Sequence, residues 1–378
     1  MKVALVHDQL SEFGGSERVL VALKKIYPKA PIFTTAYNKD SLGVHKNLIK
    51  NWKVYVSWFG KIPFLNRFYS PFRFLTPLIW ESFDFSKYDL VISSSGSWMS
   101  KGIKTKRPTL HISYVHHPPR YLYGYETALE WQKYWIVRLY AYIVNHFLRL
   151  WDFESSQRAD FLIANSEETK KRIEKFYRRE ATVIYPPVNI SDKIPSQKFE
   201  TGNYYLTVSR LAKAKHIDIL IKAANDAKFN LKIIGSGRDL IRLKALAGPT
   251  VEFLEKVSDQ QFQDLFVRAK AFLFASRDEE FGIAPVEAMG YGLPVIAFRS
   301  GGIPEFVKNA DNGFLYDQLD SSSLINKMRQ FENLSDMELL EMKKSARKSA
   351  ERFTEKIFEK NIKNFVNSKL KYARTTRS

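Results

Sequence analysis

The chain has 378 residues and a mass of 44.0 kDa, so at about 150 residues per domain it predicts two or three domains. Hydrophobic residues make up 45% and charged residues 26%, a globular composition that argues against extensive disorder, and the lack of cysteine excludes disulfides, thiolate metal centres and a cysteine nucleophile. The net charge of +19 is uneven: residues 1–150 carry +12, residues 151–360 only +2, and the tail 361–378 carries +5. That asymmetry predicts an anionic partner, nucleic acid or phospholipid, for the first part of the chain.

Strand-like runs alternate with helical periodicity along the whole chain. A first series of strands is expected at residues 3–6, 90–92, 110–115, 161–164 and 182–184. Asn165-Ser166-Glu167-Glu168 predicts the capped start of a helix, and Tyr185-Pro186-Pro187 marks a linker near residues 186–200. A second series of strands is expected at residues 204–208, 231–234, 271–275 and 295–297. Such alternation is typical of parallel sheets with helices on both faces.

The two series predict an α/β fold with two doubly wound, Rossmann-like domains that face each other across a cleft. We expect domains at residues 1–190 and 191–350, followed by a helix and basic tail at 351–378 that cross back to the first domain. In such sheets ligands bind beyond the carboxyl ends of the strands, and a cleft between domains suits a ligand of nucleotide-sugar size. The first apolar run is too short for a signal peptide and no run reaches the about 18 residues of a membrane span, so we expect a cytosolic protein.

Aromatic residues are concentrated in two stretches. Residues 51–90 hold 13 of them, a second cluster runs from Trp131 to Trp151, and both interleave rings with Lys and Arg. Such mixtures favour a membrane interface, where rings enter the headgroup layer and cations meet anionic lipid. Two other interpretations stay open: the rings form a core with Lys and Arg around it, or they stack on nucleic-acid bases. No nucleic-acid-binding motif supports the last, so we expect an anionic membrane surface at residues 51–90 and 131–151 and no nucleic acid.

The most informative string is SRDEEFGIAPVEAMGYGLPV, residues 276–295. Glu279 is expected on a loop and Glu287 in the following helix. Gly282 allows backbone N–H groups to approach a ligand at the helix start, where the helix dipole favours anions. Carboxylates at this position are well suited to accept hydrogen bonds from sugar hydroxyls.

Four stretches in order resemble the retaining glycosyltransferases of family 4, which have the two-domain GT-B fold. They are Gly14-Gly15-Ser16-Glu17, His116 after a strand, Ser209-Arg210-Leu211 with Lys215, and the string from Glu279 to Glu287. The resemblance covers essentially the full chain. It implies transfer of a hexose from a nucleoside diphosphate sugar with retention of configuration. No enzyme nucleophile is agreed for the family, so a front-face mechanism is implied, in which leaving-group oxygens help to deprotonate the acceptor.

The resemblance implies a role for each matching side chain. Arg210 and Lys215 would neutralise the donor diphosphate, as two ordered cations can do in place of a metal ion. Glu287 would bind the ribose hydroxyls, and Glu279 would hold hydroxyls of the hexose near the reacting carbon. His116 would lie beside the anomeric centre and hydrogen-bond the donor sugar or phosphate. A solvated surface position is the ordinary alternative for the cations and carboxylates, and a structural imidazole is the ordinary alternative for the histidine.

Backbone contacts are implied at several glycines. Gly14 and Gly15 would bring amides near the diphosphate, Phe281-Gly282-Ile283 would present the helix start to the donor, and Gly235 would lie near the nucleotide base. Ser300–Glu305 looks like the family's late glycine-rich turn. Ordinary turn and loop geometry is the alternative explanation for each of these glycines.

Two positions depart from the family's pattern. His216 follows the lysine where the family often has glycine, and His116-His117-Pro118 stands where His-Thr-Pro is usual, so His117 competes with His116. No Asp-x-Asp occurs in a donor-site context, so we expect neither an obligatory metal nor a cofactor besides the donor.

The stretch Tyr114–Tyr121 looks most like bacterial mannosyltransferases of surface-polysaccharide synthesis, which predicts GDP-mannose as donor, with a UDP-sugar as the alternative. Because the donor motifs lie in the second domain, we expect the acceptor on the basic, aromatic first domain. A lipid-linked glycan at the inner face of the cytoplasmic membrane would use both features. A nucleotide-sugar epimerase and a degenerate, membrane-associated partner of another transferase are the competing interpretations, and the sequence leaves the oligomeric state open.

Overall fold

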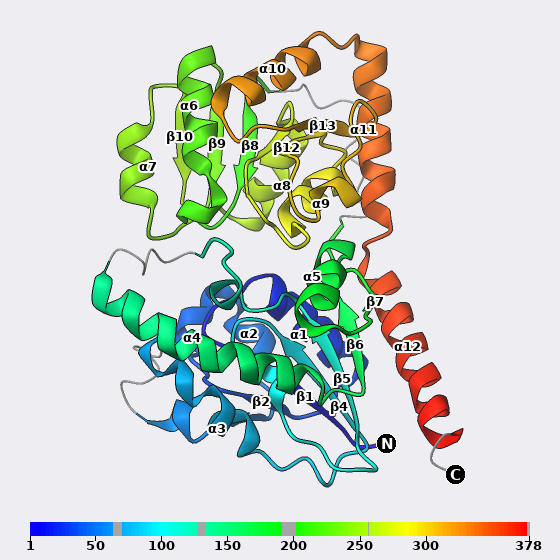
Figure 1. Ribbon diagram of the computed structural model, residues 1–378. Coiled ribbons are helices and arrows are strands. Elements are labelled where there is room, and N and C mark those ends of the chain that lie inside the picture. Colours follow the sequence, from blue (N-terminus) through cyan, green and yellow to red (C-terminus); the bar gives the residue numbers. More distant parts are fainter. Residues whose placement is uncertain (63–69, 128–133, 191–201, 256, 376–378) are drawn as a thin grey trace. The chain divides into compact units, whose positions relative to one another are not determined.

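The computed structural model describes residues 1–62, 70–127, 134–190, 202–255 and 257–375, and it divides into two compact units (Figure 1). Unit 1 comprises Met1–Tyr125, Leu129–Pro187 and Glu355–Ser378. Unit 2 comprises Glu126–Ala128 and Val188–Thr354. Of the linker expected near residues 186–200, residues 191–200 lie outside the described part. Among the described residues, no helix combines the length and the apolarity that crossing a membrane requires.

Unit 1 is built on a seven-stranded parallel sheet in the order β3-β2-β1-β4-β5-β6-β7. The strands are β1 (Val3–His7), β2 (Ile32–Thr34), β3 (Val54–Val56), β4 (Leu90–Ser95), β5 (Leu110–Val115), β6 (Phe161–Ala164) and β7 (Thr182–Val183). The central strands β4 and β5 are buried along their whole length, as expected for a sheet covered on both faces. The strand order reverses between β1 and β4, and such a switch point is where open α/β sheets bind ligands.

The helices of unit 1 are α1 (Gly15–Ile26), α2 (Lys46–Ile49), α3 (Thr76–Glu81), α4 (Trp135–Ser156), α5 (Glu167–Tyr177) and α12 (Glu355–Thr375). The predicted start of α5 is confirmed, because Ser166 caps the helix by accepting a hydrogen bond from the Thr169 amide. Helix α12 contributes Phe358, Ile362 and Val366 to the same core as the central strands, and it contacts α1. The C-terminal helix is therefore part of unit 1.

Unit 2 contains a six-stranded parallel sheet in the order β10-β9-β8-β11-β12-β13, with its switch point between β8 and β11. The strands are β8 (Tyr205–Val208), β9 (Leu231–Ile234), β10 (Val251–Leu254), β11 (Phe272–Phe274), β12 (Val295–Phe298) and β13 (Gly313–Tyr316). The helices are α6 (Ile217–Ala227), α7 (Leu240–Leu246), α8 (Asp259–Arg268), α9 (Ile283–Gly290), α10 (Ser321–Glu332) and α11 (Asp336–Glu351). The predicted fold class, two doubly wound parallel-sheet domains, is confirmed.

Candidate functional site

The loops after β8 and β11 bring Lys215 and Glu279 together at the switch point of the second sheet. The ammonium group of Lys215 pairs with Oε2 of Glu279, and both side chains are mostly buried. The hydroxyl of Ser276 donates to the same carboxylate oxygen at 2.8 Å. The two sequence motifs that carry these residues therefore meet at the edge of the sheet where α/β folds bind ligands.

The loop that carries Glu279 rests on the glycine-rich turn after β12. A Cβ atom on Gly301 would lie 1.9 Å from the carbonyl oxygen of Glu279, and one on Gly302 would lie 2.3 Å from that of Glu280. The Gly302 amide donates to the Glu279 carbonyl at 2.8 Å, and the Ser300 hydroxyl accepts from the Asp278 amide at 2.9 Å. The two backbones can approach this closely only with glycine at both positions, so the turn fixes the position of Glu279.

Helix α9 starts directly after this loop and carries Glu287. Gly282, with φ of +94°, is its N-terminal cap, and Ile283 is its first residue. The ring of Phe281 packs against Phe306 and Phe353, with ring centroids 5.5 and 5.1 Å apart. Its side chain is therefore core, and a donor contact at this position would be made by the backbone. Glu287 is a buried polar residue on the same helix.

Arg210 is exposed on the loop after β8, and the loop after β9 supports its backbone. A Cβ atom on Gly235 would lie 1.9 Å from the Ser209 carbonyl oxygen, and one on Gly237 would lie 2.2 Å from that of Leu211. This close approach of two backbones explains the glycine at position 235 without a ligand. Its contact with a nucleotide base stays a prediction.

His216 adopts the left-handed conformation, with φ of +50°, as the N-terminal cap of α6. Glycine adopts this conformation at no steric cost, which explains why the resembled family often has glycine after the lysine. Here the imidazole Nε2 pairs with Oε2 of Glu126, which clusters with unit 2, at 2.9 Å. The departure from the family's pattern keeps the backbone conformation and adds a polar contact.

At the switch point of the first sheet, His116 belongs to a chain of hydrogen bonds. The Ser94 hydroxyl lies 2.7 Å from Nε2 of His116 and 3.0 Å from Nδ1 of His7, whose Nε2 lies 3.1 Å from Oε1 of Glu17. All four side chains are buried. His117 instead places its Nδ1 2.9 Å from the Pro118 carbonyl oxygen. The structure thus connects His116, and not its competitor, to the Gly-Gly-Ser-Glu motif.

Sequence reasoning missed His7 and Ser94. The available signal was that each lies near the carboxyl end of an expected strand, and parallel strands end at the same edge of their sheet. The structure pairs the two residues directly in the register of β1 and β4.

Gly14 and Gly15 form the start of α1. The amide of Gly14, the N-terminal cap, donates to Oε2 of Glu17 at 2.8 Å, while Gly15 is exposed as the first helical residue. In this structure the Gly14 amide is therefore used to hold Glu17. A contact between these glycines and a diphosphate stays a prediction.

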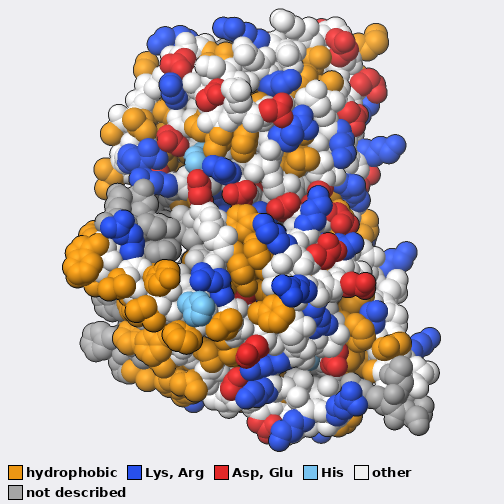
Figure 2. Space-filling view, viewed as in Figure 1, with side chains coloured by type: hydrophobic (Ala, Val, Ile, Leu, Met, Phe, Trp, Pro, Cys, Tyr) orange, Lys and Arg blue, Asp and Glu red, His pale blue; other side chains and the backbone are white. Residues whose placement is uncertain are grey.

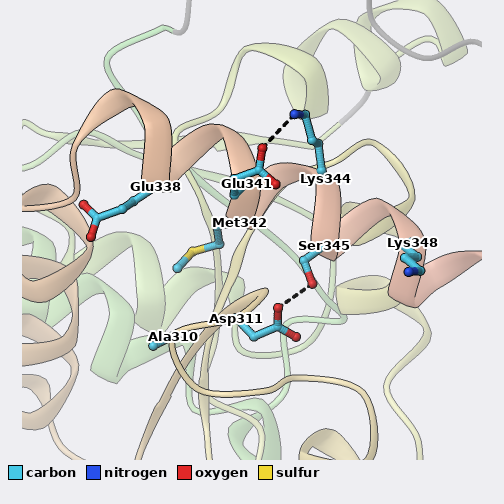
Figure 3. A pocket seen from close by; sticks show the side chains of 8 residues that line it. All are labelled: Ala310, Asp311, Glu338, Glu341, Met342, Lys344, Ser345 and Lys348. Atoms are coloured by element: carbon cyan, nitrogen blue, oxygen red, sulfur yellow. Dashed lines mark hydrogen bonds and ion pairs between the residues drawn. The ribbon is translucent and has the colours of Figure 1, made fainter.

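An open cavity of about 440 Å³ lies elsewhere on unit 2, between α11 and the turn at Ala310 and Asp311 (Figure 3). Its polar side chains are partly paired with one another: Lys344 with Glu341, and Ser345 with Asp311. None of the predicted site residues lines it. The candidate residues of each unit are therefore considered at the switch point of that unit's own sheet.

Comparison with known proteins identifies the class. The sequence profile of the family described as Glycosyltransferase Family 4 matches residues 13–192, and that of Glycosyl transferases group 1 matches residues 189–352. With its two parallel-sheet domains, the chain belongs to the GT-B glycosyltransferases, and within them to the family-4-like group.

Two relatives illustrate the range of the group. The chain is 27% identical over 297 residues to the GtfA subunit of the UDP-N-acetylglucosamine–peptide N-acetylglucosaminyltransferase of Streptococcus pneumoniae, covering 74% of this chain and 55% of that protein. It is 33% identical over 194 residues to the O-antigen chain mannosyltransferase RfbU of Salmonella typhimurium, covering 48% and 54%. The chain thus spans about half the length of these relatives.

Solved structures share the fold over nearly the whole chain. HepE of Anabaena in complex with UDP superimposes with a TM-score of 0.71 at 21% identity, covering 97% of this chain and 100% of that one. The lipopolysaccharide outer core galactosyltransferase WaaB superimposes with a TM-score of 0.64 at 22% identity, covering 98% and 100%. At these identities the likeness establishes the fold and leaves donor and acceptor to be argued from the site.

Proposed function

We propose that this protein is a retaining hexosyltransferase that moves a hexose from a nucleoside diphosphate sugar to a lipid-linked glycan. The observation that carries the proposal is the pairing of Lys215 with Glu279 at the switch point of the second sheet, beside the start of α9. A lysine there can stabilise the charge that develops on a departing diphosphate, and a carboxylate can accept hydrogen bonds from sugar hydroxyls. With Arg210 on the same loop as Lys215, the site offers two cations to one diphosphate.

The donor base and sugar are open between two classes, and each has support. The match to an O-antigen mannosyltransferase favours GDP-mannose, which is our first choice. The UDP complex of HepE and the UDP-N-acetylglucosamine specificity in the name of the GtfA relative favour a UDP-sugar.

The first test is thermal unfolding in EDTA with UDP, GDP, ADP and their hexose conjugates. A ligand at 100 times its dissociation constant stabilises the native state by about 2.7 kcal/mol. We expect stabilisation by one nucleotide class, and loss of that stabilisation in the variant Lys215→Met. Lys344→Met is the matched control, because Lys344 also pairs with a carboxylate in unit 2 but lies at the cavity of Figure 3, away from both switch points.

Each outcome is decisive. Stabilisation by GDP-mannose alone fixes the donor class, and stabilisation by a UDP-sugar keeps the transferase and discards mannose. A shift that appears only when Mg²⁺ replaces EDTA overturns the expected metal independence. If no nucleotide stabilises the protein against thermal unfolding, the better hypothesis is a catalytically degenerate partner of another transferase.

A second observation concerns the acceptor and supports a membrane-bound substrate: the outer face of α4 is apolar and exposed. Ten large hydrophobic side chains of this helix are exposed, among them Trp135 at 66%, Tyr142 at 78% and Phe147 at 65%. Figure 2 shows hydrophobic side chains gathered over the part of unit 1 where Figure 1 draws α4. An apolar face of this size marks an interaction surface.

The opposite face of α4 is firmly attached to unit 1. Asp152 forms a buried ion pair with Lys101 and accepts a hydrogen bond from the Tyr123 hydroxyl at 2.7 Å. The Trp151 ring fills the space next to Gly102, where a Cβ atom would lie 2.2 Å from the ring. Because these contacts fix the inner face, the outer apolar residues are presented by a well-anchored helix.

Charge decides which partner fits this face. Residues 135–150 contain Arg138, Arg149 and His146 but no acidic residue, and unit 1 carries +18 of the net charge of +19. Apolar rings beside cations match an anionic bilayer, where each basic residue near the surface contributes about 1 kcal/mol. We propose that α4 lies in the interface of an anionic membrane and brings the first domain to its lipid-linked acceptor.

The stretch 51–90 contributes less to this surface than its aromatic content predicts. Phe59, Trp80, Phe85 and Tyr88 are buried in one core cluster, so for these rings the core interpretation is correct. The exposed hydrophobic residues there are Trp58, Ile62, Phe74 and Leu78. The Tyr140 hydroxyl donates to the Pro71 carbonyl, which brings this segment to α4. Residues 63–69 and 131–133 lie outside the described part of the chain.

Vesicle flotation tests the membrane proposal. We expect the protein to float with vesicles of phosphatidylglycerol and phosphatidylcholine at low salt, and less with phosphatidylcholine alone. The triple variant Tyr142→Ser, Ile143→Ser, Phe147→Ser should bind at least about tenfold more weakly, because it removes apolar area from the outer face. Ile241→Ser on α7 is the control, since Ile241 is 84% exposed but lies on unit 2. The proposal is wrong if the triple variant binds vesicles as well as the unaltered protein. It is also wrong if the unaltered protein is a dimer that the triple variant converts to a monomer.

A further inference from the structure

The row of hydrogen bonds Glu17–His7–Ser94–His116 allows only one arrangement of protons when the imidazoles of His7 and His116 are both neutral. Burial alone would raise the pKa of Glu17, but the hydrogen bond from His7, attraction to a positive charge on His7, and hydrogen bonds from the amides of Glu17 and Gly14 bring it below its ordinary value. Glu17 is therefore an ionised carboxylate, which can only accept. It follows that Nε2 of His7 carries the proton that is donated to Glu17.

The position of the proton on His7 also fixes which atoms donate and accept between Ser94 and His116. With its proton on Nε2, a neutral His7 accepts at Nδ1, and the group within reach is the Ser94 hydroxyl at 3.0 Å. A hydroxyl has one proton to donate, so Ser94 accepts from Nε2 of His116 at 2.7 Å. The lone pair of His116 is then on Nδ1.

Ser94 itself does not meet a substrate. Glutamate, histidine and serine are arranged here as in a hydrolytic triad, in which the carboxylate fixes the tautomer of the imidazole. The Ser94 side chain, however, is completely buried, and its oxygen is engaged by both histidines. The serine therefore transmits the orientation that Glu17 imposes instead of acting as a nucleophile.

We propose that Glu17, His7 and Ser94 are positioning residues that keep the proton of His116 on Nε2, so that His116 accepts a hydrogen bond at Nδ1 from a hydroxyl of the transferred hexose. A phosphate oxygen cannot donate, so the contact implied for His116 is to the sugar and not to the diphosphate. This inference rests on the proposed function, since it assumes that a hexose reaches His116.

Imidazole N–H signals provide a test that does not depend on activity. In the full chain labelled with ¹⁵N-histidine, buried, hydrogen-bonded imidazole protons exchange slowly enough to be assigned to one ring nitrogen. We expect the protons of His7 and His116 on Nε2 in both rings, with assignments from the loss of signals in His7→Gln and His116→Gln. A proton on Nδ1 of either ring reverses the direction of the chain and overturns the proposal.

The strand β4 offers a matched control for a kinetic test. Ser93 is as buried as Ser94 and makes a hydrogen bond of 2.9 Å to Nε2 of another histidine, His111. Burial, followed by the charge of Arg179, lowers the pKa of His111 to about 3, so the Ser93–His111 pair is neutral. Ser93→Ala breaks one buried serine–histidine contact, and Ser94→Ala breaks two on the same strand, both of them in the hydrogen-bond chain to His116.

We expect Ser94→Ala to lower kcat/KM for release of UDP or GDP from the sugar nucleotide about 10- to 100-fold. Ser93→Ala should change it less than about twofold, although it too loses stability on thermal unfolding. Equal losses in the two variants would mean a purely structural role and overturn the proposal. Failure of the unaltered protein to consume any sugar nucleotide would contradict the proposed function. The ring-nitrogen assignments would still decide the direction of the hydrogen bonds from Glu17 to His116.

Discussion

The polar side chains at the switch points of the two sheets differ in charge and in burial. In unit 2, the oppositely charged Lys215 and Glu279 meet in a partly exposed position on loops held by close backbone contacts. In unit 1, a buried chain of hydrogen bonds runs from the Glu17 carboxylate at one end to His116 at the other. An ion pair on loops that solvent still reaches can exchange its partner for a charged ligand, whereas a buried chain of hydrogen bonds holds one ring in one orientation. The first arrangement suits donor binding, and the second suits the positioning of a reacting group.

The units also differ in composition in a way that makes them separable by experiment. All seven tryptophans lie between residues 52 and 151, and residues 188–354 contain none. Tryptophan fluorescence therefore reports on unit 1, whereas nucleotide binding is expected to report on unit 2. Changes confined to one unit can be measured against the other in the same sample.

The largest expected effect is on the stability of unit 1. Lys101→Met leaves the carboxylate of Asp152 buried without its cation, and removing one partner of a buried ion pair typically costs about 3–5 kcal/mol. Urea unfolding followed by tryptophan fluorescence should show this loss. The double variant Lys101→Met, Asp152→Asn should recover part of it, because neither charge remains in the apolar interior.

The outcome also bears on the outer face of α4. If the double variant is no more stable than Lys101→Met alone, the ion pair and its hydrogen bond from Tyr123 act as a unit that a neutral pair cannot replace. In that case α4 should lose membrane binding together with its anchor.

The next effect is on activity and is confined to unit 2. Lys215→Met and Glu279→Gln should each lower kcat/KM about 100- to 1,000-fold, since each removes a group that acts on developing charge or on the sugar. The double variant should lose much less than the product of the two, because the side chains contact each other. Steady-state kinetics with the donor identified by thermal unfolding measures the cycle.

Lys344→Met and Glu341→Gln are the control for that cycle. They break an exposed ion pair on α11 of the same unit, and both should leave kcat/KM unchanged. Full additivity at Lys215 and Glu279 would contradict a shared role in one site.

The sequence predicted the parts of this architecture that depend on local patterns. Buried apolar runs located most of the central strands, and the Asn-Ser-Glu-Glu motif located the start of α5. Strands β2, β3, β10 and β13 were missed, and all four lie at or next to a sheet edge and are only three or four residues long. Short edge strands show little of the continuous hydrophobic pattern that marks a central strand.

The site was predictable only where one segment carries the signal. The string from Glu279 to Glu287 is contiguous, so its residues could be named from the sequence. The chain to His116 joins residues separated by up to about 110 positions, and His7 and Ser94 are ordinary residue types in their own segments. Only the register of parallel strands brings them together, and register is a tertiary property.

The smallest expected effect tests the backbone beside Lys215. His216 and Lys228 cap the two ends of α6 with φ of +50° and +59°, a conformation that costs a residue with a side chain about 1–2 kcal/mol. Glycine avoids that cost but loses more entropy on folding, so Lys228→Gly should stabilise unit 2 by about 0.5–1 kcal/mol. His216→Gly should stabilise it less, because it also loses the contact with Glu126. Calorimetry of the two variants measures the difference. A larger gain from His216→Gly than from Lys228→Gly would show that the contact with Glu126 holds the loop in a strained position, and nucleotide affinity should then change with it, since Lys215 is the adjacent residue.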